Sequence, residues 1–442
     1  MNRYGYALIG LITLACVSAR AADKPADSNQ VTAKAIERWQ DLRFGMFITW
    51  GPATLTGKEI SWSRNRETPT ETYDNLYKKF NPTKFNADEW VAIAKESGMK
   101  YIVLICKHCD GFCLWDTKYT DYNIMHSPFG RDVVKELSEA CKREGMPFGA
   151  YYSVSDYRHP GWVVKNPRVK RAKYDLDAYA IYLQNQVREL LQNYGHLLTI
   201  WFDADTGPED FTAFAKHGLE TIDFARKIQP DIVINNRTLA ARNSGDYATP
   251  ERNIGDFNMV RPWETCWELG SQWAWKPNDT PTSLKSLLHT LIKVAGNDGN
   301  LLLNAGPKST GEFEPEDVAR LKEIGAWLKQ YGESIYGTRG GPYLPSGYGS
   351  STRKGQTVYL HVLNMPASGK LHLPALPAKV VSSRLLTGGE VTVTASETSI
   401  DVAFSPKNRD NIDTIVALEL DRPAMELEVI NPNVCTSLTT GK

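Results

Sequence analysis

The sequence predicts a (β/α)8-like TIM barrel, an α/β fold, followed by a C-terminal all-β sandwich domain. Short apolar runs alternate with amphipathic stretches from residue 38 onward, which is typical of parallel strands joined by helical crossovers. Polar or aromatic residues end nearly every run, as expected where a site is built at the carboxyl ends of barrel strands. A doubly wound sheet would show the same alternation, but no G-x-G-x-x-G follows the first strand.

The expected elements follow one another in a regular order. The helix NADEWVAIAKESG has Asn86 at its N-cap and Gly98 just past its end. The predicted strands are 44–50, 101–106, 147–154, 197–203 and 231–236, with a short segment at 263–266. The predicted helices are 86–98, 131–145, about 175–194, 211–228 and 284–296. From 341 to 442, short alternating runs between Gly and Pro replace the helical pattern and predict the sandwich.

The first 21 residues, MNRYGYALIGLITLACVSARA, have the composition of a secretory signal peptide. Arg3 precedes an apolar stretch, and a small-x-small site ends at Ala21. We therefore expect cleavage near Ala21 and an exported protein, either periplasmic or secreted. A lipid anchor at Cys16 is an alternative that Thr13 fits poorly. We expect residues 22–37 to be a flexible segment, and no later run to be long enough to span a membrane.

Composition excludes several classes of partner. The 442 residues carry 51 basic and 51 acidic side chains, and this zero net charge argues against nucleic acid as the main partner. The 12 Trp and 20 Tyr suit stacking on sugars as well as core packing. Cys106 and Cys109 have the spacing of half a zinc site, but no matching second pair follows. We therefore expect no metal and no cofactor.

Asp203 is the first candidate for chemistry because it ends the apolar strand LLTIWFD. A carboxylate there is costly unless it faces the open end of the barrel. The alternative is that Asp203 caps the following segment, and Asp205 is a competitor.

Glycoside chemistry requires a second carboxylate to protonate the leaving oxygen. Glu251, in GDYATPER, and Glu264, in RPWETC, are the two candidates. Glu251 could equally be a solvated loop residue, and Glu264 could form an ion pair with Arg261 or Arg237. Sequence spacing does not rank the two glutamates.

Residues suited to a sugar pocket follow several of the predicted strands. None of these residues would indicate a site by itself. Their shared position after predicted barrel strands is what indicates one. They are Glu59 and Trp62, His108, Tyr151 and Tyr152, and Arg237.

Ordered segments resemble the retaining α-L-fucosidase family of glycoside hydrolases, from about residue 38 to 337. These are RFGMFITWG, FNADEWVAIAKESGMKYIVLICKHCDGFCLW, RDVVKELSEACKREGMPFGAYYSVSDY, IWFD, GDYATPER, WETC, GNDGNLLLNAGP and YGESIYG. The resemblance implies an exo-acting retaining α-glycosidase that acts on fucosylated oligosaccharides or glycoconjugates. It implies that Asp203 is the nucleophile. The TPER segment of this chain resembles that of members using a loop glutamate, which favours Glu251 as acid/base, with Glu264 as the alternative.

The resemblance also implies a set of residues that contact the substrate. They are Thr49, Trp50, Glu59, Trp62, His108, Cys109, Tyr152, Trp201, Arg237 and Trp273. Two of them depart from the family pattern, in which F-I-H-W-G and K-H-H-D-G-F place histidines at the positions of Thr49 and Cys109. A thiol is a weak hydrogen-bond partner and a hydroxyl is shorter than an imidazole. The protein could therefore cleave α-L-fucosides, cleave another glycoside, or bind glycans without cleaving them.

Overall fold

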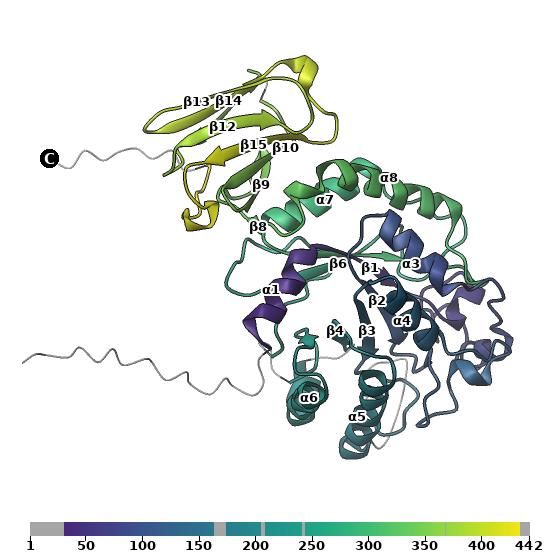
Figure 1. The fold of residues 1–442 in the computed structure, drawn as a ribbon. Helices are drawn as coiled ribbons and strands as arrows, with labels where there is room; N and C mark the ends of the chain where they lie inside the picture. Colours follow the sequence, from purple (N-terminus) through teal and green to yellow (C-terminus); the bar gives the residue numbers. More distant parts are fainter. Residues whose placement is uncertain (1–30, 163–173, 205–207, 241–243, 367, 434–442) are drawn as a thin grey trace, which may run out of the picture.

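Parallel strands alternate with outer helices through most of the chain (Figure 1). The structure, a computed structural model, describes residues 31–162, 174–204, 208–240, 244–366 and 368–433. The barrel strands are β1 (Phe44–Ile48), β2 (Ile102–Lys107), β3 (Phe148–Ser153), β4 (Thr199–Asp203), β5 (Val233–Ile234), β6 (Glu264–Glu268) and β7 (Asn300–Ala305). The helices are α1 (Ala33–Leu42), α2 (Thr70–Asp74), α3 (Ala87–Glu96), α4 (Val133–Arg143), α5 (Leu176–Asn193), α6 (Pro208–Ile228), α7 (Leu284–Gly296) and α8 (Pro315–Tyr331).

The barrel strands form one parallel sheet in the order β5-β4-β3-β2-β1-β7-β6. Residues 247–251 take the place of an eighth strand between β5 and β6. Tyr247 forms a parallel bridge with Asn235, and Ala248 forms one with Trp263. This segment completes the ring, and the predicted (β/α)8-like barrel is confirmed.

Helix α3 illustrates how local sequence sets the element boundaries. The Asn86 side chain accepts hydrogen bonds from the N–H groups of Asp88 and Glu89. These are two of the backbone N–H groups in the first turn that have no acceptor within the helix. Gly98 follows with φ of 79°, a left-handed conformation that suits glycine just after a helix. Trp90 is buried on the inner face. The predicted helix 86–98 therefore spans Ala87–Glu96.

Helix α1 begins inside the segment that we expected to be flexible, because residues 33–37 form its first half. Thr32 caps the helix by accepting a hydrogen bond from the N–H of Ala35. The indole of Trp39 is fully buried and lies 4.4 Å from the ring of Tyr247, measured between centroids. Burial of this large apolar ring within the barrel is what orders the helix.

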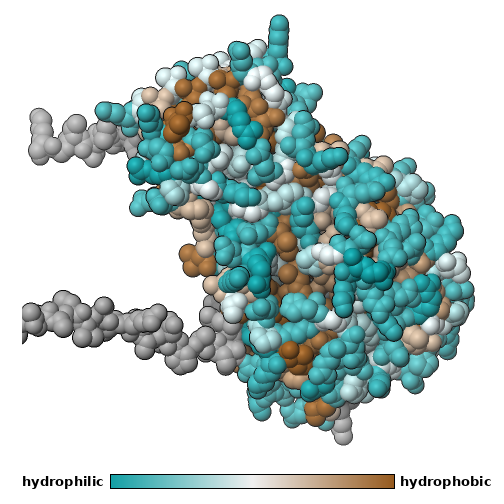
Figure 2. All heavy atoms as spheres, viewed as in Figure 1, coloured by the Kyte–Doolittle hydropathy of each residue, from teal (hydrophilic) through white to brown (hydrophobic). Residues whose placement is uncertain are grey.

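Large side chains fill the barrel interior. The interior cluster consists of Trp39, Phe47, Tyr101, Val103, Ile105, Tyr151, Trp201, Val233, Tyr247, Cys266 and Leu302. On the face drawn in Figure 2, hydrophobic residues appear only as separate patches. The barrel is therefore a packed core with room for a site only at its ends.

The chain after the barrel forms two antiparallel sheets beside α7 and α8 (Figure 1). Their strands are β8 (Arg339–Gly340), β9 (Gly349–Lys354), β10 (Thr357–Val362), β11 (Lys370–Pro374), β12 (Val380–Leu385), β13 (Val391–Ala395), β14 (Ser399–Phe404) and β15 (Thr414–Leu420). Gly296, at the end of α7, packs so closely on β9 that a Cβ there would lie 1.7 Å from Ser350 Oγ. The antiparallel C-terminal domain predicted from the alternating runs is confirmed.

Candidate active site

A pocket opens where the barrel strands end, as the strand-end polar residues predict. It is lined by Phe47, Trp62, Ile105, His108, Tyr151, Trp201, Asp203, Arg237, Glu251, Cys266 and Trp273. A larger cavity lies at the opposite end, where β3, β4 and β5 begin, and includes Phe148, Leu198 and Val233. Active sites of such barrels occur at the carboxyl ends of the strands, so we assign the site to the smaller pocket.

Asp203 is the last residue of β4 and accepts two hydrogen bonds within the pocket. Tyr151 Oη donates to its Oδ2 over 2.8 Å, and Arg237 Nη1 donates to its Oδ1 over 2.8 Å. Burial alone would raise the pKa of Asp203. The charge and hydrogen bond of Arg237, with the hydrogen bond from Tyr151, outweigh burial and lower this pKa below its ordinary value. The carboxylate is therefore ionised at neutral pH, as a nucleophile requires.

Arg237 connects the two carboxylates of the pocket. Its Nη1 also lies 3.2 Å from Glu251 Oε2, while its Nε and Nη2 donate to Thr249 Oγ1 and O over 2.9 and 2.7 Å. Asp203 Oδ1 and Glu251 Oε2 can therefore be no farther apart than the two Nη1 distances combined, about 6 Å. Carboxyl groups lie about 5–5.5 Å apart in retaining glycosidases and about 6.5–9.5 Å apart in inverting ones.

The two candidate glutamates lie in different surroundings. Glu251 lines the pocket, and its side chain is 39% exposed. The backbone of Glu251 forms a parallel β-bridge with Cys266 of β6. Glu264 begins β6 and is fully buried in the barrel, where Tyr101 Oη and Trp201 Nε1 donate to its two oxygens. Only Glu251 lines the pocket beside Asp203, whereas Glu264 supports Trp201 from below.

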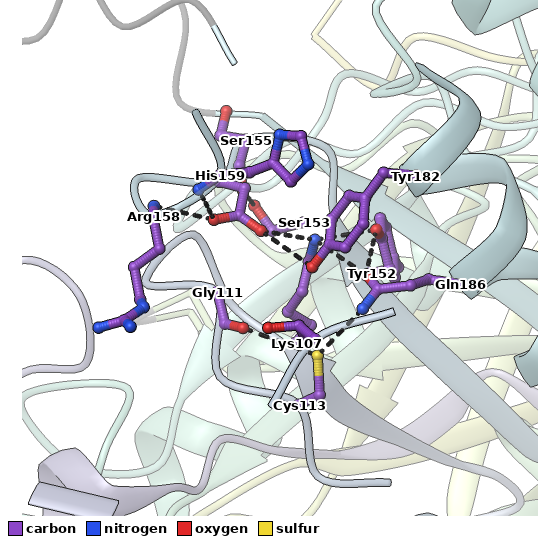
Figure 3. Close-up of polar contacts among 12 residues, drawn as sticks. Lys107, Gly111, Cys113, Tyr152, Ser153, Ser155, Arg158, His159, Tyr182 and Gln186 are labelled. Carbon is purple, nitrogen blue, oxygen red and sulfur yellow. Dashed lines mark hydrogen bonds and ion pairs between the residues drawn. The ribbon is translucent and has the colours of Figure 1, made fainter. Parts of the chain in front are cut away.

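Of the two adjacent tyrosines named from sequence, Tyr151 faces the pocket, whereas Tyr152, the one that the resemblance implies as a substrate contact, does not. Tyr151 pairs with Trp201 across the sheet, and Tyr152 pairs with Phe202. Successive side chains on a strand point to opposite faces, so Tyr151 shares the inner face with Trp201 and Asp203. Tyr152 points outward into a buried polar cluster with Lys107 and Gln186 (Figure 3).

Glu59 supports the pocket wall through the backbone. Its carboxylate accepts hydrogen bonds from the N–H groups of Trp273 and Ala274 over 2.8 and 3.0 Å. Burial raises the pKa of Glu59 despite these bonds. Glu59 was expected to contact substrate, but the structure assigns both of its oxygens to the loop that carries Trp273. Trp273 itself lines the pocket, as expected.

The end of the first strand also supports the pocket without lining it. Thr49 Oγ1 donates to Asn304 Oδ1 over 2.6 Å, and Asn304 Nδ2 donates to the carbonyl of Trp273 over 2.8 Å. Trp50 packs among Phe80, Phe85 and Trp90 in the core outside the barrel. Trp50 is turned away from the pocket, and this position does not support the contact with substrate that the resemblance implies.

His108 and Cys109 follow β2, and the imidazole lines the pocket. The ring of His108 is parallel to that of Tyr151 at 5.8 Å and perpendicular to that of Trp62 at 6.1 Å. Cys109 is buried, with Sγ 3.3 Å from His108 Nδ1. In the described part of the chain, no disulfide joins any two of Cys106, Cys109, Cys113, Cys141 and Cys266, and no three His, Cys, Asp or Glu side chains are grouped to hold a metal.

Comparison with known proteins identifies the family. The family described as alpha-L-fucosidase matches residues 12–333. The chain belongs to the alpha-L-fucosidase family. Plasma alpha-L-fucosidase of Homo sapiens is 27% identical over 373 residues, which cover 77% of this chain and 79% of the human protein.

Two solved alpha-L-fucosidases share the fold. Isoenzyme 1 from Paenibacillus thiaminolyticus matches with a TM-score of 0.80 and 31% identity, covering 88% of this chain and 99% of that one. A structure from Bacteroides thetaiotaomicron, described as a trapped covalent intermediate of a family 29 enzyme, matches with a TM-score of 0.78 and 26% identity. It covers 88% of this chain and 96% of that one. As a member of this family, the chain is a retaining glycoside hydrolase with a glycan substrate.

Replacing Glu264 with glutamine is expected to reduce the pH dependence of stability. Burial raises the pKa of Glu264 to about 7, above the ordinary value of about 4.3 that applies in the unfolded chain. Between these values only the folded state holds the proton, so its stability falls as pH rises, by about 1.4 kcal/mol per pH unit. Above about pH 7 this loss is complete.

Urea unfolding at several pH values measures this effect. From pH 5 to pH 8 the free energy of unfolding of the wild type should fall by about 2–3 kcal/mol relative to Glu264→Gln. Parallel curves for the two proteins would show that Glu264 is ionised in the folded state throughout this range.

Proposed function

We propose that this protein removes α-L-fucose from the non-reducing ends of fucosylated glycans, with Asp203 as nucleophile and Glu251 as acid/base. The bridging of both carboxylates by Arg237 Nη1 at the pocket carries this proposal, since it keeps Asp203 Oδ1 and Glu251 Oε2 within about 6 Å of each other, which favours the close spacing of a retaining glycosidase. Glu264 is the less favoured alternative because both of its oxygens are engaged inside the barrel.

The reaction is a double displacement. An oxygen of Asp203 attacks the anomeric carbon while Glu251 gives its proton to the departing glycosidic oxygen, so a covalent fucosyl-enzyme forms and the aglycone leaves as an alcohol. Water then attacks the same carbon from the opposite face. Glu251 takes a proton from that water, the bond to Asp203 breaks, and fucose leaves with its α configuration retained.

The other pocket residues bind and orient the sugar. Trp62, Trp201 and Trp273 offer aromatic faces, and His108 offers a polar edge. Burial alone would lower the pKa of Arg237, but the charge of Asp203 and the hydrogen bond to it raise this pKa above its ordinary value, so Arg237 stays protonated. Thr49 and Cys109 stand where the family pattern has histidines. We therefore propose that the pocket offers fewer strong hydrogen-bond partners to the sugar hydroxyls than the family pattern does.

The chain is further proposed to be exported. Residues 1–21 have the pattern of a signal peptide, and these residues lie outside those that the structure describes. A relative named as a plasma enzyme supports an extracellular or periplasmic location. Among the described residues, no helix is long and apolar enough to cross a membrane. We propose a catalytic barrel over about residues 38–340 and a β-sandwich over about 341–442, with β8 at their boundary pairing with β9 of the sandwich.

A panel of aryl glycosides tests the proposed function. Aryl α-L-fucoside should be hydrolysed, and aryl α-D-galactoside and α-L-rhamnoside should not, because the pocket is proposed to recognise the fucosyl ring. Proton NMR of the fresh reaction should show α-L-fucose before it mutarotates. Faster hydrolysis of another sugar would contradict the proposal and indicate that Thr49 and Cys109 mark an altered specificity.

A further inference from the structure

Ser61 has an unusual backbone conformation directly behind the pocket. It lies between the 3₁₀ helix Pro52–Thr56 and α2, is fully buried, and has φ of 56°. This left-handed conformation is unfavourable for a residue other than glycine, and it persists only where surrounding contacts enforce it.

A closed set of hydrogen bonds enforces the conformation of Ser61. Its N–H donates to Tyr73 Oη over 2.7 Å, and that hydroxyl donates to Asp110 Oδ2 over 2.6 Å. The N–H of Asp110 in turn donates to Ser61 Oγ over 3.0 Å. The loop of Ser61 is thereby joined to the loop after β2, which carries His108.

The remaining bond of Ser61 determines which nitrogen of His108 carries the proton. Ser61 Oγ lies 2.6 Å from His108 Nδ1. Because Oγ already accepts a hydrogen bond from Asp110, its own proton requires an acceptor, and Nδ1 is the one within reach. Nδ1 of the neutral ring is then unprotonated, and Nε2 holds the proton. The Sγ of Cys109 lies 3.3 Å from the same Nδ1 and can accept a hydrogen bond from it when Nδ1 is protonated.

We propose that Ser61 is a positioning residue that holds His108 in the Nε2–H tautomer, so that the imidazole presents a hydrogen-bond donor to a hydroxyl of the sugar beside Asp203. The proposal rests on the proposed function for the identity of the ligand. His108 lines the pocket, and its Nδ1 faces Ser61 and Cys109, so Nε2 lies on the edge of the ring away from these two residues. Without the Ser61 hydroxyl, the proton could move to Nδ1, and the sugar hydroxyl would face a lone pair.

The chain offers a matched control. Ser63 is a buried serine two residues away on the same loop, and its Oγ has no hydrogen-bond partner among the described residues. Ser61→Ala and Ser63→Ala therefore delete the same atom from the same loop, but only the first removes a bond to His108. Ser61→Gly removes the hydroxyl and also relieves the left-handed backbone, so it serves if Ser61→Ala does not fold.

Nitrogen-15 NMR of histidine in the free enzyme is the decisive measurement. The resonances of His108 are assigned by their loss in His108→Gln. We expect protonated Nε2 and unprotonated Nδ1 in the wild type and in Ser63→Ala, and a mixture of tautomers or protonated Nδ1 in Ser61→Ala. Wild-type His108 with its proton on Nδ1, or an unchanged tautomer in Ser61→Ala, would overturn the proposal.

Kinetics on aryl α-L-fucoside give the second measurement. kcat/KM should fall about tenfold in Ser61→Ala, as expected for one misdirected hydrogen bond, and should be unchanged in Ser63→Ala. Equal kcat/KM in Ser61→Ala and the wild type would also contradict the proposal. Because the NMR experiment needs no turnover, a protein with the expected tautomer that hydrolyses no fucoside would refute the proposed function and leave the tautomer assignment standing.

Discussion

Asp203→Ala is expected to lower kcat on an aryl α-L-fucoside by about 10⁴- to 10⁶-fold, the loss that follows removal of a nucleophile. The substitution deletes the group that would form the covalent intermediate, and Arg237 retains Glu251 as a partner. Initial rates measure the effect. The control is Asp88→Ala, which removes an exposed carboxylate paired with Arg143 on the surface and should leave the rate unchanged.

Added azide distinguishes loss of a nucleophile from a general disturbance of the pocket. In Asp203→Ala, azide can occupy the space of the carboxylate and attack the anomeric carbon directly, displacing the aryl oxide in a single step. The product should then be β-L-fucosyl azide, with inverted configuration. Residual activity within about tenfold of the wild type would assign the nucleophile to another residue.

Glu251→Ala is expected to lower kcat on a fucosylated oligosaccharide by about 10²- to 10⁴-fold, the usual contribution of general acid–base catalysis. An alkoxide is a poor leaving group without a proton, whereas an activated aryl oxide leaves without one. The loss in kcat/KM should therefore be smaller on an aryl fucoside with an acidic phenol. Rates on the two substrates measured side by side report this difference.

The stereochemistry of rescue separates Glu251 from Asp203. Azide needs no general base, so it should accelerate turnover of the fucosyl-enzyme in Glu251→Ala. It attacks opposite the bond to Asp203, and the product should be α-L-fucosyl azide. Glu264→Gln is the matched control, because the glutamine amide can accept a hydrogen bond from Trp201 Nε1 and donate one to Tyr101 Oη, and kcat should stay within about tenfold of the wild type. If Glu264→Gln lost activity and Glu251→Ala did not, the two roles would be exchanged.

Several parts of the fold follow from local sequence. The alternation of apolar runs with amphipathic stretches predicts the barrel because strand and helix periods differ and parallel strands need crossovers. Asn86 and Gly98 mark the ends of α3 because they satisfy the backbone there. Helix α1 was missed because the burial of Trp39 beneath Tyr247, a residue about two hundred positions away, is what orders it.

The candidate site also has features that follow from local sequence and features that depend on tertiary contacts. Asp203 is recognisable from sequence, since a carboxylate that ends an apolar strand needs an open strand end. The choice of Tyr151 over Tyr152 depends on the register of β3 against β4, and a shift of one residue would exchange them. The two tyrosines are adjacent in the same apolar run, so only the pairing of the strands decides which of them faces the pocket.

The sequence by itself determined the barrel, the following β domain, the family and the carboxylate that ends β4. Each depends on local periodicity or on residues close together in the chain. Only the tertiary structure decided which glutamate faces Asp203 and which nitrogen of His108 faces Ser61. Those outcomes depend on contacts such as Arg237 with Glu251 and Ser61 with His108, which bring separate loops together. Packing and hydrogen bonding across the whole barrel set such distances, and no local pattern encodes them.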